Sequence, residues 1–191
     1  MTTLFDKLVS IERALRDANI PHAFGGAIAL GFHIVEPRAT ADIDVNLFVP
    51  EVDASTTFAA LPPEITWDAA DLHEVETNGQ VRVFWDDTPV DLFFETHRFH
   101  RHTAERVEQV SFDGVDVPVL GATELTIFKA FFDRTKDWAD IEAMVDAGTV
   151  DIHAAIGWLV DLLGADDHRV ARLRTLLDRK PPAREPRFMR D

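Results

Sequence analysis

The stretch Arg38-Ala-Thr-Ala-Asp-Ile-Asp-Val-Asn-Leu-Phe-Val49 alternates between apolar and polar residues, which is typical of a half-buried strand. The apolar face holds Ile43, Val45, Leu47 and Val49, and the polar face holds Asp42, Asp44 and Asn46. Two carboxylates side by side on one strand repel each other unless a cation lies between them. The alternation therefore predicts a strand over residues 42–49 with a divalent-metal site on its polar face.

A Gly-Gly pair, Gly25-Gly26, precedes this strand and opens a predicted helix rich in small residues. Glycine lets backbone N–H groups approach phosphate oxygens closely, and a helix N-terminus adds a favourable dipole. Arg38 and Thr40 add a guanidinium and a hydroxyl that could bind the same phosphates. A Gly-Gly pair alone is more often a simple turn. Beside a metal site, we expect it to help bind a nucleoside triphosphate.

A third acid, Asp91, lies in a later predicted strand, on the face opposite Val90, Leu92 and Phe94. If this strand lies next to the first one, Asp91 completes a carboxylate set for Mg²⁺ or Mn²⁺. In two-metal sites the ions lie about 3.5–4 Å apart, and one of them activates the attacking hydroxyl. We therefore expect Asp91 to act as a metal ligand or as the base. The alternative is that these acids face solvent on an edge strand.

The composition excludes several classes of protein. The 191 residues, 46% hydrophobic and 28% charged, can bury the core of one domain with a small helical addition. The absence of cysteine excludes disulfides, thiolate zinc sites and cysteine nucleophiles, and the absence of tyrosine excludes self-nucleotidylation on that residue. No apolar run approaches the roughly 20 residues of a membrane span, and no secretory signal is present. We expect a cytoplasmic protein without membrane contact.

The charge is strongly acidic but unevenly distributed. The formal net charge of −15 argues against bulk electrostatic binding to a polyanion, and we expect no sequence-specific DNA binding. Residues 169–191 carry eight Lys or Arg against three acids, a net of +5, so the first 168 residues carry −20. The basic end is either a contact for RNA phosphates or a solvated helix face with a frayed tail. In a second basic cluster, we interpret His97, His100 and His102 as surface residues rather than metal ligands.

The order of the predicted elements indicates an α+β protein, with strands in the first 120 residues and helices in the last 70. The predicted strands are 42–49, 80–85, 90–95, and the pair 107–112 and 115–120 around an Asp113-Gly114 turn, and residues 22–24 form a short apolar run before the glycine pair. The predicted helices are 3–18, 27–33, 52–61, one capped by Thr123, 138–146 with Gly148 as its C-cap, 151–163 and 166–179. We divide the chain into a catalytic core (1–122), a helical part (123–180) and a flexible tail (181–191).

Taken together, Gly25-Gly26, Arg38-x-Thr40-x-Asp42-x-Asp44 and a later strand with Asp91 resemble the polymerase-β-like nucleotidyltransferase superfamily. The stretch from Glu124 to Ile141 resembles its AbiEii/MenT-type toxin branch, which has a Lys on one helix and an Arg-x-Lys-Asp-x-x-Asp run opening the next. This resemblance covers residues 20–145. It implies a nucleotidyltransferase-type mixed sheet with flanking helices, followed by a helical C-terminal portion.

The resemblance also implies an activity, namely Mg²⁺-dependent transfer of a nucleoside monophosphate from an NTP to an acceptor hydroxyl. In that branch the acceptor is a tRNA 3′ end, and the enzyme is the toxin of a toxin–antitoxin pair. Lys129 would contact the triphosphate, Arg134 and Lys136 would bind nucleotide, and either Asp137 or Asp140 would be the acid of the last motif. Those charged residues could instead be ordinary ion pairs at a helix start.

Two alternatives follow from the acidic charge and from the fold. The acceptor could be a small cationic molecule, such as an antibiotic, or a protein side chain. The protein could also be a non-catalytic pseudoenzyme or antitoxin that uses the fold as a docking surface.

Overall fold

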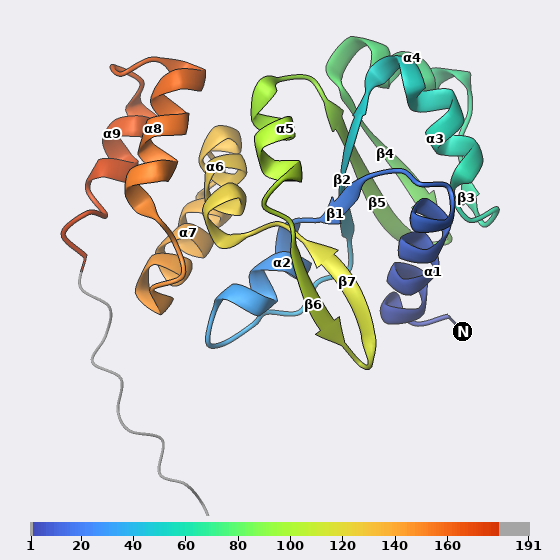
Figure 1. Ribbon diagram of the computed structural model, residues 1–191, viewed down its shortest axis with the longest axis horizontal. Coiled ribbons are helices and arrows are strands. Elements are labelled where there is room, and N and C mark those ends of the chain that lie inside the picture. The colour runs from blue at the N-terminus through green and yellow to red at the C-terminus, as the bar shows by residue number, and fades with distance from the viewer. Residues whose placement is uncertain (1, 180–191) are drawn as a thin grey trace, which may run out of the picture.

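The computed structural model describes residues 2–179, and its centre is a mixed seven-stranded sheet with the order β3-β4-β5-β2-β1-β7-β6 (Figure 1). The strands are β1 (His22–Phe24), β2 (Ile43–Pro50), β3 (Ile65–Thr66), β4 (Gln80–Trp85), β5 (Thr88–Glu95), β6 (Glu108–Phe112) and β7 (Val115–Val119). β2 lies at the middle of the sheet, parallel to β5 and antiparallel to β1. The predicted strand over 42–49 is confirmed within one residue, and so is the α+β fold class.

Helices flank the sheet, with α1, α3 and α4 on one side and α6 to α9 on the other (Figure 1). Their bounds are α1 (Leu4–Asp17), α2 (Gly26–His33), η1 (Glu51–Asp53), α3 (Ala54–Ala60), α4 (Ala69–Asn78), α5 (Arg98–Ala104), α6 (Ala122–Phe132), α7 (Thr135–Ala147), α8 (Ile152–Leu163) and α9 (His168–Arg174). α6 packs against α2, α7 and α8, so it connects the sheet to the last helices. This position brings residues of α6 next to the polar face of β2.

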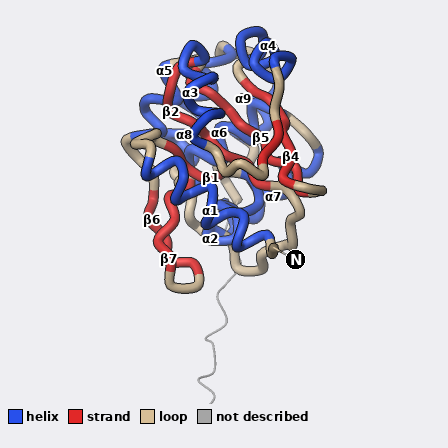
Figure 2. Tube along the Cα trace, turned by 90° about the vertical axis from the view of Figure 1, so that its right-hand side faces the viewer, coloured by secondary structure: helices blue, strands red, loops and turns tan. Residues whose placement is uncertain are grey.

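Local sequence signals explain several element ends. Thr3 caps α1 in a capping box with Asp6, and the left-handed Gly148 ends α7 as predicted. The predicted hairpin around Asp113-Gly114 is confirmed as β6–β7, which extends away from the body of the protein (Figures 1 and 2). Both turn residues have positive φ, which such a two-residue turn requires.

Three predictions of local structure were wrong or incomplete. Thr123 does not cap α6, because the helix already begins at Ala122, and the Thr123 hydroxyl instead accepts a hydrogen bond from the Asp151 N–H at 2.9 Å. The turn between β4 and β5 has only two residues, so Pro89 lies inside β5 and not in the turn. The sequence analysis also missed β3, α4 and α5. An Asp68-x-x-Asp71 capping box marks the start of α4 and could have revealed that helix.

Buried apolar side chains from the sheet, α1 and the C-terminal helices form one hydrophobic cluster. The proposed division at residue 122 stays a prediction, and the proposed flexible tail lies outside the described residues. Within residues 2–179, no helix has both the length and the apolar character that crossing a membrane requires.

Gly79, between α4 and β4, packs so closely against Thr96 that a larger side chain has no room there. It has a φ of +67°, and a Cβ there would lie 2.1 Å from Thr96 Cγ2. Gly148 has a similar φ of +71°, but a Cβ there would meet no atom within 4 Å. We expect Gly148→Ala to lower the free energy of unfolding by about 1–2 kcal/mol, the cost of left-handed backbone. Gly79→Ala should cost about 3 kcal/mol or more, because Thr96 must also move.

Urea unfolding of both variants measures this difference. Equal losses of stability would contradict the tight contact between Gly79 and Thr96.

Candidate active site

Asp44 and Asp91 are neighbours on the two central parallel strands. Asp44 of β2 and Asp91 of β5 are partners in the register of the sheet. Neighbouring strands lie about 4.8 Å apart, so side chains at the same register position on the same face are close. Both residues line one cleft. The structure therefore brings these two carboxylates together.

Asp44 is the most perturbed acid of the site. Burial, together with the charges of Asp42 and Asp91, raises the pKa of its carboxyl to about 6, although the charges of Lys129 and Arg134 oppose the change. The hydrogen bonds of the described residues include none from a side chain to the Asp44 carboxylate. A buried carboxylate beside two like charges would be stabilised by a bound cation.

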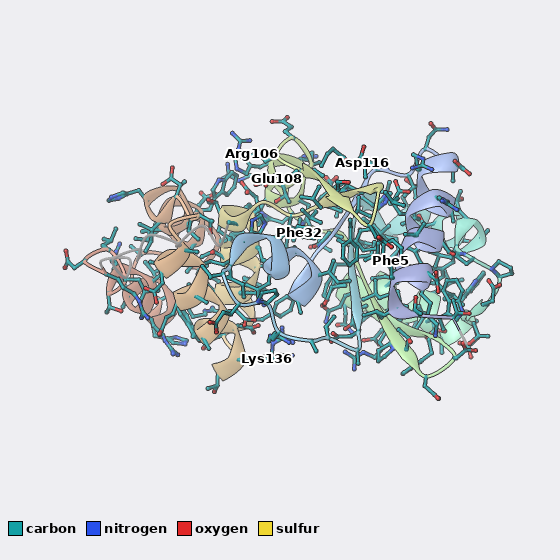
Figure 3. The ribbon with its side chains drawn as sticks, turned by 90° about the horizontal axis from the view of Figure 1, so that it is seen from below. Phe5, Phe32, Arg106, Glu108, Asp116 and Lys136 are labelled. Carbon is teal, nitrogen blue, oxygen red and sulfur yellow. The ribbon has the colours of Figure 1, made fainter. Side chains whose placement is uncertain are left out.

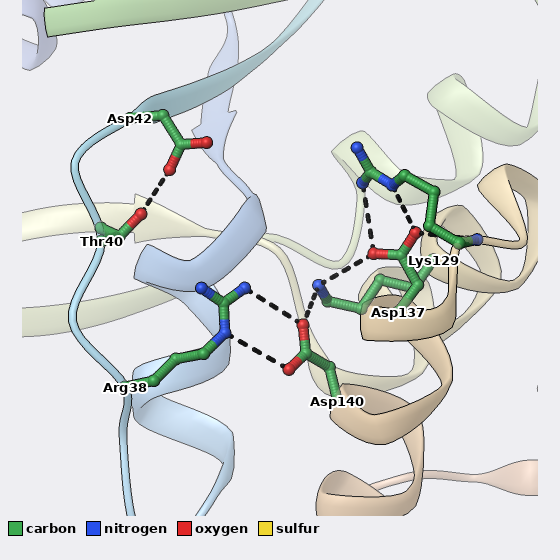
Figure 4. A network of polar contacts seen from close by, with 7 residues as sticks. Arg38, Thr40, Asp42, Lys129, Asp137 and Asp140 are labelled. Carbon is green, nitrogen blue, oxygen red and sulfur yellow. Dashed lines mark hydrogen bonds and ion pairs between the residues drawn. The ribbon is translucent and has the colours of Figure 1, made fainter.

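Asp42 lies just before β2, and the hydroxyl of Thr40 donates a short hydrogen bond to it (Figure 4). Partial burial acts to raise the pKa of Asp42, but the Thr40 hydrogen bond and the charges of Lys136 and Arg38 lower it below its ordinary value. At neutral pH Asp42 is therefore ionised, whereas the pKa of its neighbour Asp44, at about 6, lies much closer to that pH. Thr40 orients a carboxylate in this structure, and its predicted contact with phosphate stays a prediction.

Asp91 forms a bidentate ion pair with Arg82 of β4. Arg82 Nε and Nη2 each donate a hydrogen bond to one Asp91 oxygen at 2.7 Å, and the two residues face each other in the β4–β5 register. This pair raises the pKa of Arg82. Two parallel N–H···O bonds fix the plane of the carboxylate. Arg82 therefore orients Asp91 in the cleft.

The glycine pair makes room for these side chains. Gly26 begins α2 with a φ of +54°, and a Cβ there would lie 1.8 Å from Asp44 Oδ2. A Cβ on Gly25 would lie 2.6 Å from Asn46 Nδ2. The Gly25 N–H also donates to the Asp44 carbonyl at 2.9 Å, which joins the turn to β2. Both glycines are thus required for close packing against β2, whether or not the turn binds phosphate.

A network of ion pairs lies beside the carboxylates (Figure 4). Lys129 Nζ of α6 donates to Asp140 Oδ2 at 2.7 Å and lies 3.6 Å from Asp137 Oδ1. Arg38 also donates to Asp140, at 3.3 and 3.4 Å, and Arg134 donates to Asp137 at 2.6 and 3.2 Å. Each carboxylate therefore holds two cations, one of them the buried Lys129.

The two aspartates of α7, Asp137 and Asp140, hold these cations in position. Asp137 is fully buried and completes the N-terminal cap of α7 with Arg134. Burial acts to raise the pKa of Asp140, but hydrogen bonds from Lys129 and Arg38 lower it below its ordinary value. Among the described residues, neither aspartate lines the cleft, whereas Lys129 and Arg134 do. We interpret Asp137 and Asp140 as positioning residues for the two cations.

The cleft has a volume of about 340 Å³, enough for part of a nucleotide. Of the predicted site residues, those that line it are Gly26, Asp44, Asp91, Lys129 and Arg134. Lys136 is exposed and does not line the cleft, although its charge acts on Asp42. His97, His100 and His102 do not converge on this site. His100 is buried, so its placement at the surface was wrong.

The donor set fits a hard divalent cation. Asp42, Asp44 and Asp91 offer only carboxylate oxygens, which Mg²⁺ and Mn²⁺ prefer. Within residues 2–179, no three His, Asp or Glu side chains are already close enough to hold a metal ion. Asp91 is paired with Arg82, so a metal would have to share its carboxylate. The raised pKa of Asp44 is the observation that favours a cation here.

The sequence analysis missed Arg82, Glu74 and the phenylalanines that line the cleft, among them Phe93 and Phe132. Arg82 could have been found. Counting back from a two-residue turn at Asp86-Asp87 pairs Arg82 with Asp91 across the hairpin. Glu74 lies on α4, a helix that was not predicted. The aromatic residues come from separate elements, and only the tertiary structure brings them together.

No protein-family model matches the sequence, and no curated protein matches it significantly. Solved structures do resemble it. The solution structure of the antibiotic-resistance factor ANT(2'')-Ia has a TM-score of 0.54 and 15% identity, covering 92% of this chain and 91% of that one. The lincosamide antibiotic adenylyltransferase LnuA, with lincomycin bound, has a TM-score of 0.52 and 10% identity, covering 75% of this chain and 98% of that one.

A crystal structure of ANT(2'')-Ia in complex with adenylyl-2''-tobramycin gives a TM-score of 0.51 with 14% identity, over 91% of this chain and 97% of that one. At such low identity these likenesses show the fold alone, a mixed sheet with flanking helices of the kind found in nucleotidyltransferases, and membership of the polymerase-β-like superfamily stays a prediction. The resemblance to the AbiEii/MenT branch stays a prediction.

The pKa of Asp44 predicts how stability changes with pH. The folded protein holds the Asp44 proton up to about pH 6, whereas the unfolded chain releases it near its ordinary value of 3.8. Its contribution to stability is therefore fully present below pH 3.8 and is lost as the pH rises to 6, by at most about 3 kcal/mol. We expect Asp44→Asn to be more stable than the wild type at pH 7 and to lack this loss.

Chemical unfolding of both proteins from pH 4 to 7 measures the difference. Added Mg²⁺ should stabilise the wild type at pH 7 and have little effect on Asp44→Asn. If the two proteins show parallel pH profiles, Asp44 is not the buried, charge-crowded acid described above.

The ion network predicts that Lys129 contributes strongly to stability. Lys129→Met removes the buried cation between Asp137 and Asp140, so we expect a loss of about 3–5 kcal/mol in the free energy of unfolding. Arg38→Met removes a partner that is 44% exposed and should cost about 1 kcal/mol or less.

In the double variant Lys129→Met/Asp140→Asn, part of the loss should be recovered, because one uncompensated charge is gone. Strictly additive losses in urea unfolding would show that the two side chains do not interact.

Proposed function

We propose that this protein is a divalent-metal-dependent nucleotidyltransferase that moves a nucleoside monophosphate from an NTP to an acceptor hydroxyl. The observation that carries the proposal is the register pairing of Asp44 and Asp91, in a cleft that Lys129 and Arg134 also line. Carboxylates and cations in one cleft match the two needs of nucleotidyl transfer, a metal site and a triphosphate site. The nucleotidyltransferase fold supports this activity.

The reaction requires one bond to form and one to break. The acceptor oxygen bonds to the α-phosphorus of the NTP, the bond from that phosphorus to the β-phosphate bridging oxygen breaks, and pyrophosphate leaves. The acceptor proton passes to Asp91 or to solvent. Asp42, Asp44 and Asp91 would hold Mg²⁺ or Mn²⁺, which supplies charge neutralisation and lowers the pKa of the acceptor hydroxyl when bound.

The basic side chains would hold the triphosphate. Arg134 lines the cleft, and the charges of Asp44 and Asp91 act on it. Lys129 is already bound to Asp140, so it would reach a phosphate only by sharing or exchanging that partner. Arg38, Gly25, Gly26 and Thr40 stay candidates for further phosphate contacts, and Lys136 is less well placed because it does not line the cleft.

For the acceptor, the resemblance to the AbiEii/MenT branch favours a tRNA 3′ end or another RNA 3′ end. The protein would then be the toxin of a toxin–antitoxin system and would have a cognate antitoxin. The basic helix α9, with Arg169, Arg172 and Arg174, offers a surface for RNA phosphates.

A second candidate acceptor is a small cationic molecule, and the observation that favours it is charge. The protein has a net charge of −15, which attracts cations and repels polyanions. One structural neighbour is described as a lincosamide antibiotic adenylyltransferase, and another is a complex with adenylyl-2''-tobramycin. A non-catalytic role is less well supported, because a pseudoenzyme has no need to keep Asp44 and Asp91 together in the cleft.

Transfer of label from radioactive NTPs tests the proposal. Wild-type protein, Mg²⁺ and each of the four α-³²P-labelled NTPs are incubated either with total tRNA or with a panel of aminoglycosides. Label on RNA supports the RNA acceptor, and label on the drugs supports the cationic acceptor. Label on neither, together with no NTP or Mg²⁺ binding by calorimetry, would reject an enzymatic role.

The matched variants are Asp42→Ala and Asp116→Ala. Asp116 lies on the β6–β7 hairpin, away from the cleft (Figure 3), so its loss should leave the rate unchanged. Asp42→Ala should lower transfer at least 1,000-fold while the protein stays folded, since like-charge repulsion is relieved. Retained incorporation by Asp42→Ala would reject the assignment of the metal site.

A further inference from the structure

A second cavity adjoins the candidate active site. It has a volume of about 150 Å³ and shares Gln80, Phe93, Phe128 and Phe132 with the cleft, so these side chains form a common wall. It lies between the start of β4, the end of β5, α5 and α6. We call it the aromatic pocket. A molecule bound across the wall would lie in both spaces.

Phenylalanine side chains form much of the wall of the aromatic pocket. Phe128, Phe131 and Phe132 come from α6, Phe99 comes from α5 and Phe93 comes from β5. Among the described residues, no Asp, Glu, Lys or Arg lines the pocket, in contrast to the cleft. Phe131 and Phe132 are 45% and 38% exposed, so the pocket is reached from the surface. Such a space favours an uncharged planar group.

Two histidines line the pocket, and their hydrogen bonds to the backbone define which ring nitrogen can donate and which can accept. His97 Nδ1 accepts a hydrogen bond from the Phe99 N–H at 3.1 Å, which leaves Nε2–H as a donor. His100 Nδ1 lies 3.3 Å from the His97 carbonyl, which can only accept, so His100 Nε2 is left as an acceptor. Burial lowers the pKa of His100, so its ring is neutral at pH 7.

Gln80 adds an amide at the common wall. It begins β4 and lines both spaces. Among the hydrogen bonds of residues 2–179, none involves the Gln80 side chain, so its N–H₂ and C=O remain available. An amide can donate and accept at once, which suits the edge of a nucleobase.

We propose that the aromatic pocket binds a nucleobase of single-ring size, presented by one of the two substrates of the proposed transfer reaction. The volume of about 150 Å³ matches a single benzene-sized ring, so a pyrimidine fills the pocket and a fused purine extends beyond it. Stacking on phenylalanine supplies affinity, while His97, His100 and Gln80 contact the base edge. The role of the pocket in the reaction rests on the proposed function, whereas binding of the base rests on the pocket alone.

The base can come from the NTP or from the terminal nucleoside of an RNA acceptor. Both sources present the same chemistry to the pocket, and the common wall allows the attached ribose and phosphate to reach Asp44 and Asp91. Kinetics distinguish the two sources, and direct binding of a nucleoside tests the pocket without catalysis.

The binding test uses cytidine and adenosine without metal, followed by ¹H–¹⁵N NMR of the full chain. Cytidine should shift the amides of Gly79 and Thr96, which line the pocket, and adenosine should bind at least tenfold more weakly. Leu162→Phe should weaken cytidine binding at least tenfold, because Leu162 lines the pocket from α8 and the larger side chain fills it.

Leu163→Phe is the matched control, since its neighbouring position lines neither cavity. If Leu162→Phe does not fold, Phe131→Ala replaces it, because this exposed ring can be removed without opening the core. No saturable cytidine binding, or equal binding by wild type and Leu162→Phe, would overturn the inference.

Steady-state transfer assays then identify which substrate supplies the base that the pocket binds. A KM for the NTP that rises at least fivefold in Leu162→Phe assigns it to the nucleotide, and a similar rise for the acceptor assigns it to the RNA. Unchanged values for both substrates would overturn the role of the pocket in the reaction. Cytidine binding by a protein that transfers no nucleotide would reject only the proposed function, and transfer without cytidine binding would reject only this inference.

Discussion

The repulsion among Asp42, Asp44 and Asp91 is the constraint on which this structure depends. The central parallel pair β2–β5 places two of these acids in register, and burial raises the energy of the charged form of Asp44. The surrounding residues reduce this cost. Arg82 pairs with Asp91, Thr40 donates to Asp42, and glycine at position 26 removes a steric conflict with the Asp44 carboxylate. A bound cation would complete the compensation.

The ion network makes stability and proposed catalysis depend on the same side chains. Lys129 is buried between Asp137 and Asp140, and it also faces the cleft. A buried ion pair contributes little net stability, but removing one partner is costly. The network therefore explains why α7 begins where it does, and why its cations are held in place before a substrate binds. For the proposed triphosphate, Arg134 and Lys129 are thus already held near the cleft, and Lys129 would only have to share or exchange Asp140.

Alternating residues were enough to predict the central strand, its polar face and the β6–β7 hairpin, because period-two patterns follow from strand geometry alone. Asp91 could be assigned to a strand, but its neighbour could not, since parallel pairing depends on a distant crossover. The partners of Lys129 also depended on how α6 and α7 pack. The aromatic pocket was beyond reach from the sequence, because its rings come from β5, α5 and α6.

The local charge explains why metal and nucleotide should bind together. The cleft is lined by three carboxylates (Glu74, Asp44 and Asp91) and by three basic side chains (Arg82, Lys129 and Arg134), so its lining carries no net positive charge. A triphosphate without metal would therefore find no net attraction in the cleft, even with Arg134 and Lys129 present. Divalent cations reverse this balance, because they are the largest local charges in such a site. The acidic charge of the protein is thus compatible with an anionic nucleotide that binds as its metal complex. The charge therefore restricts the proposed acceptor more than the nucleotide, because the acceptor would bind without such a cation.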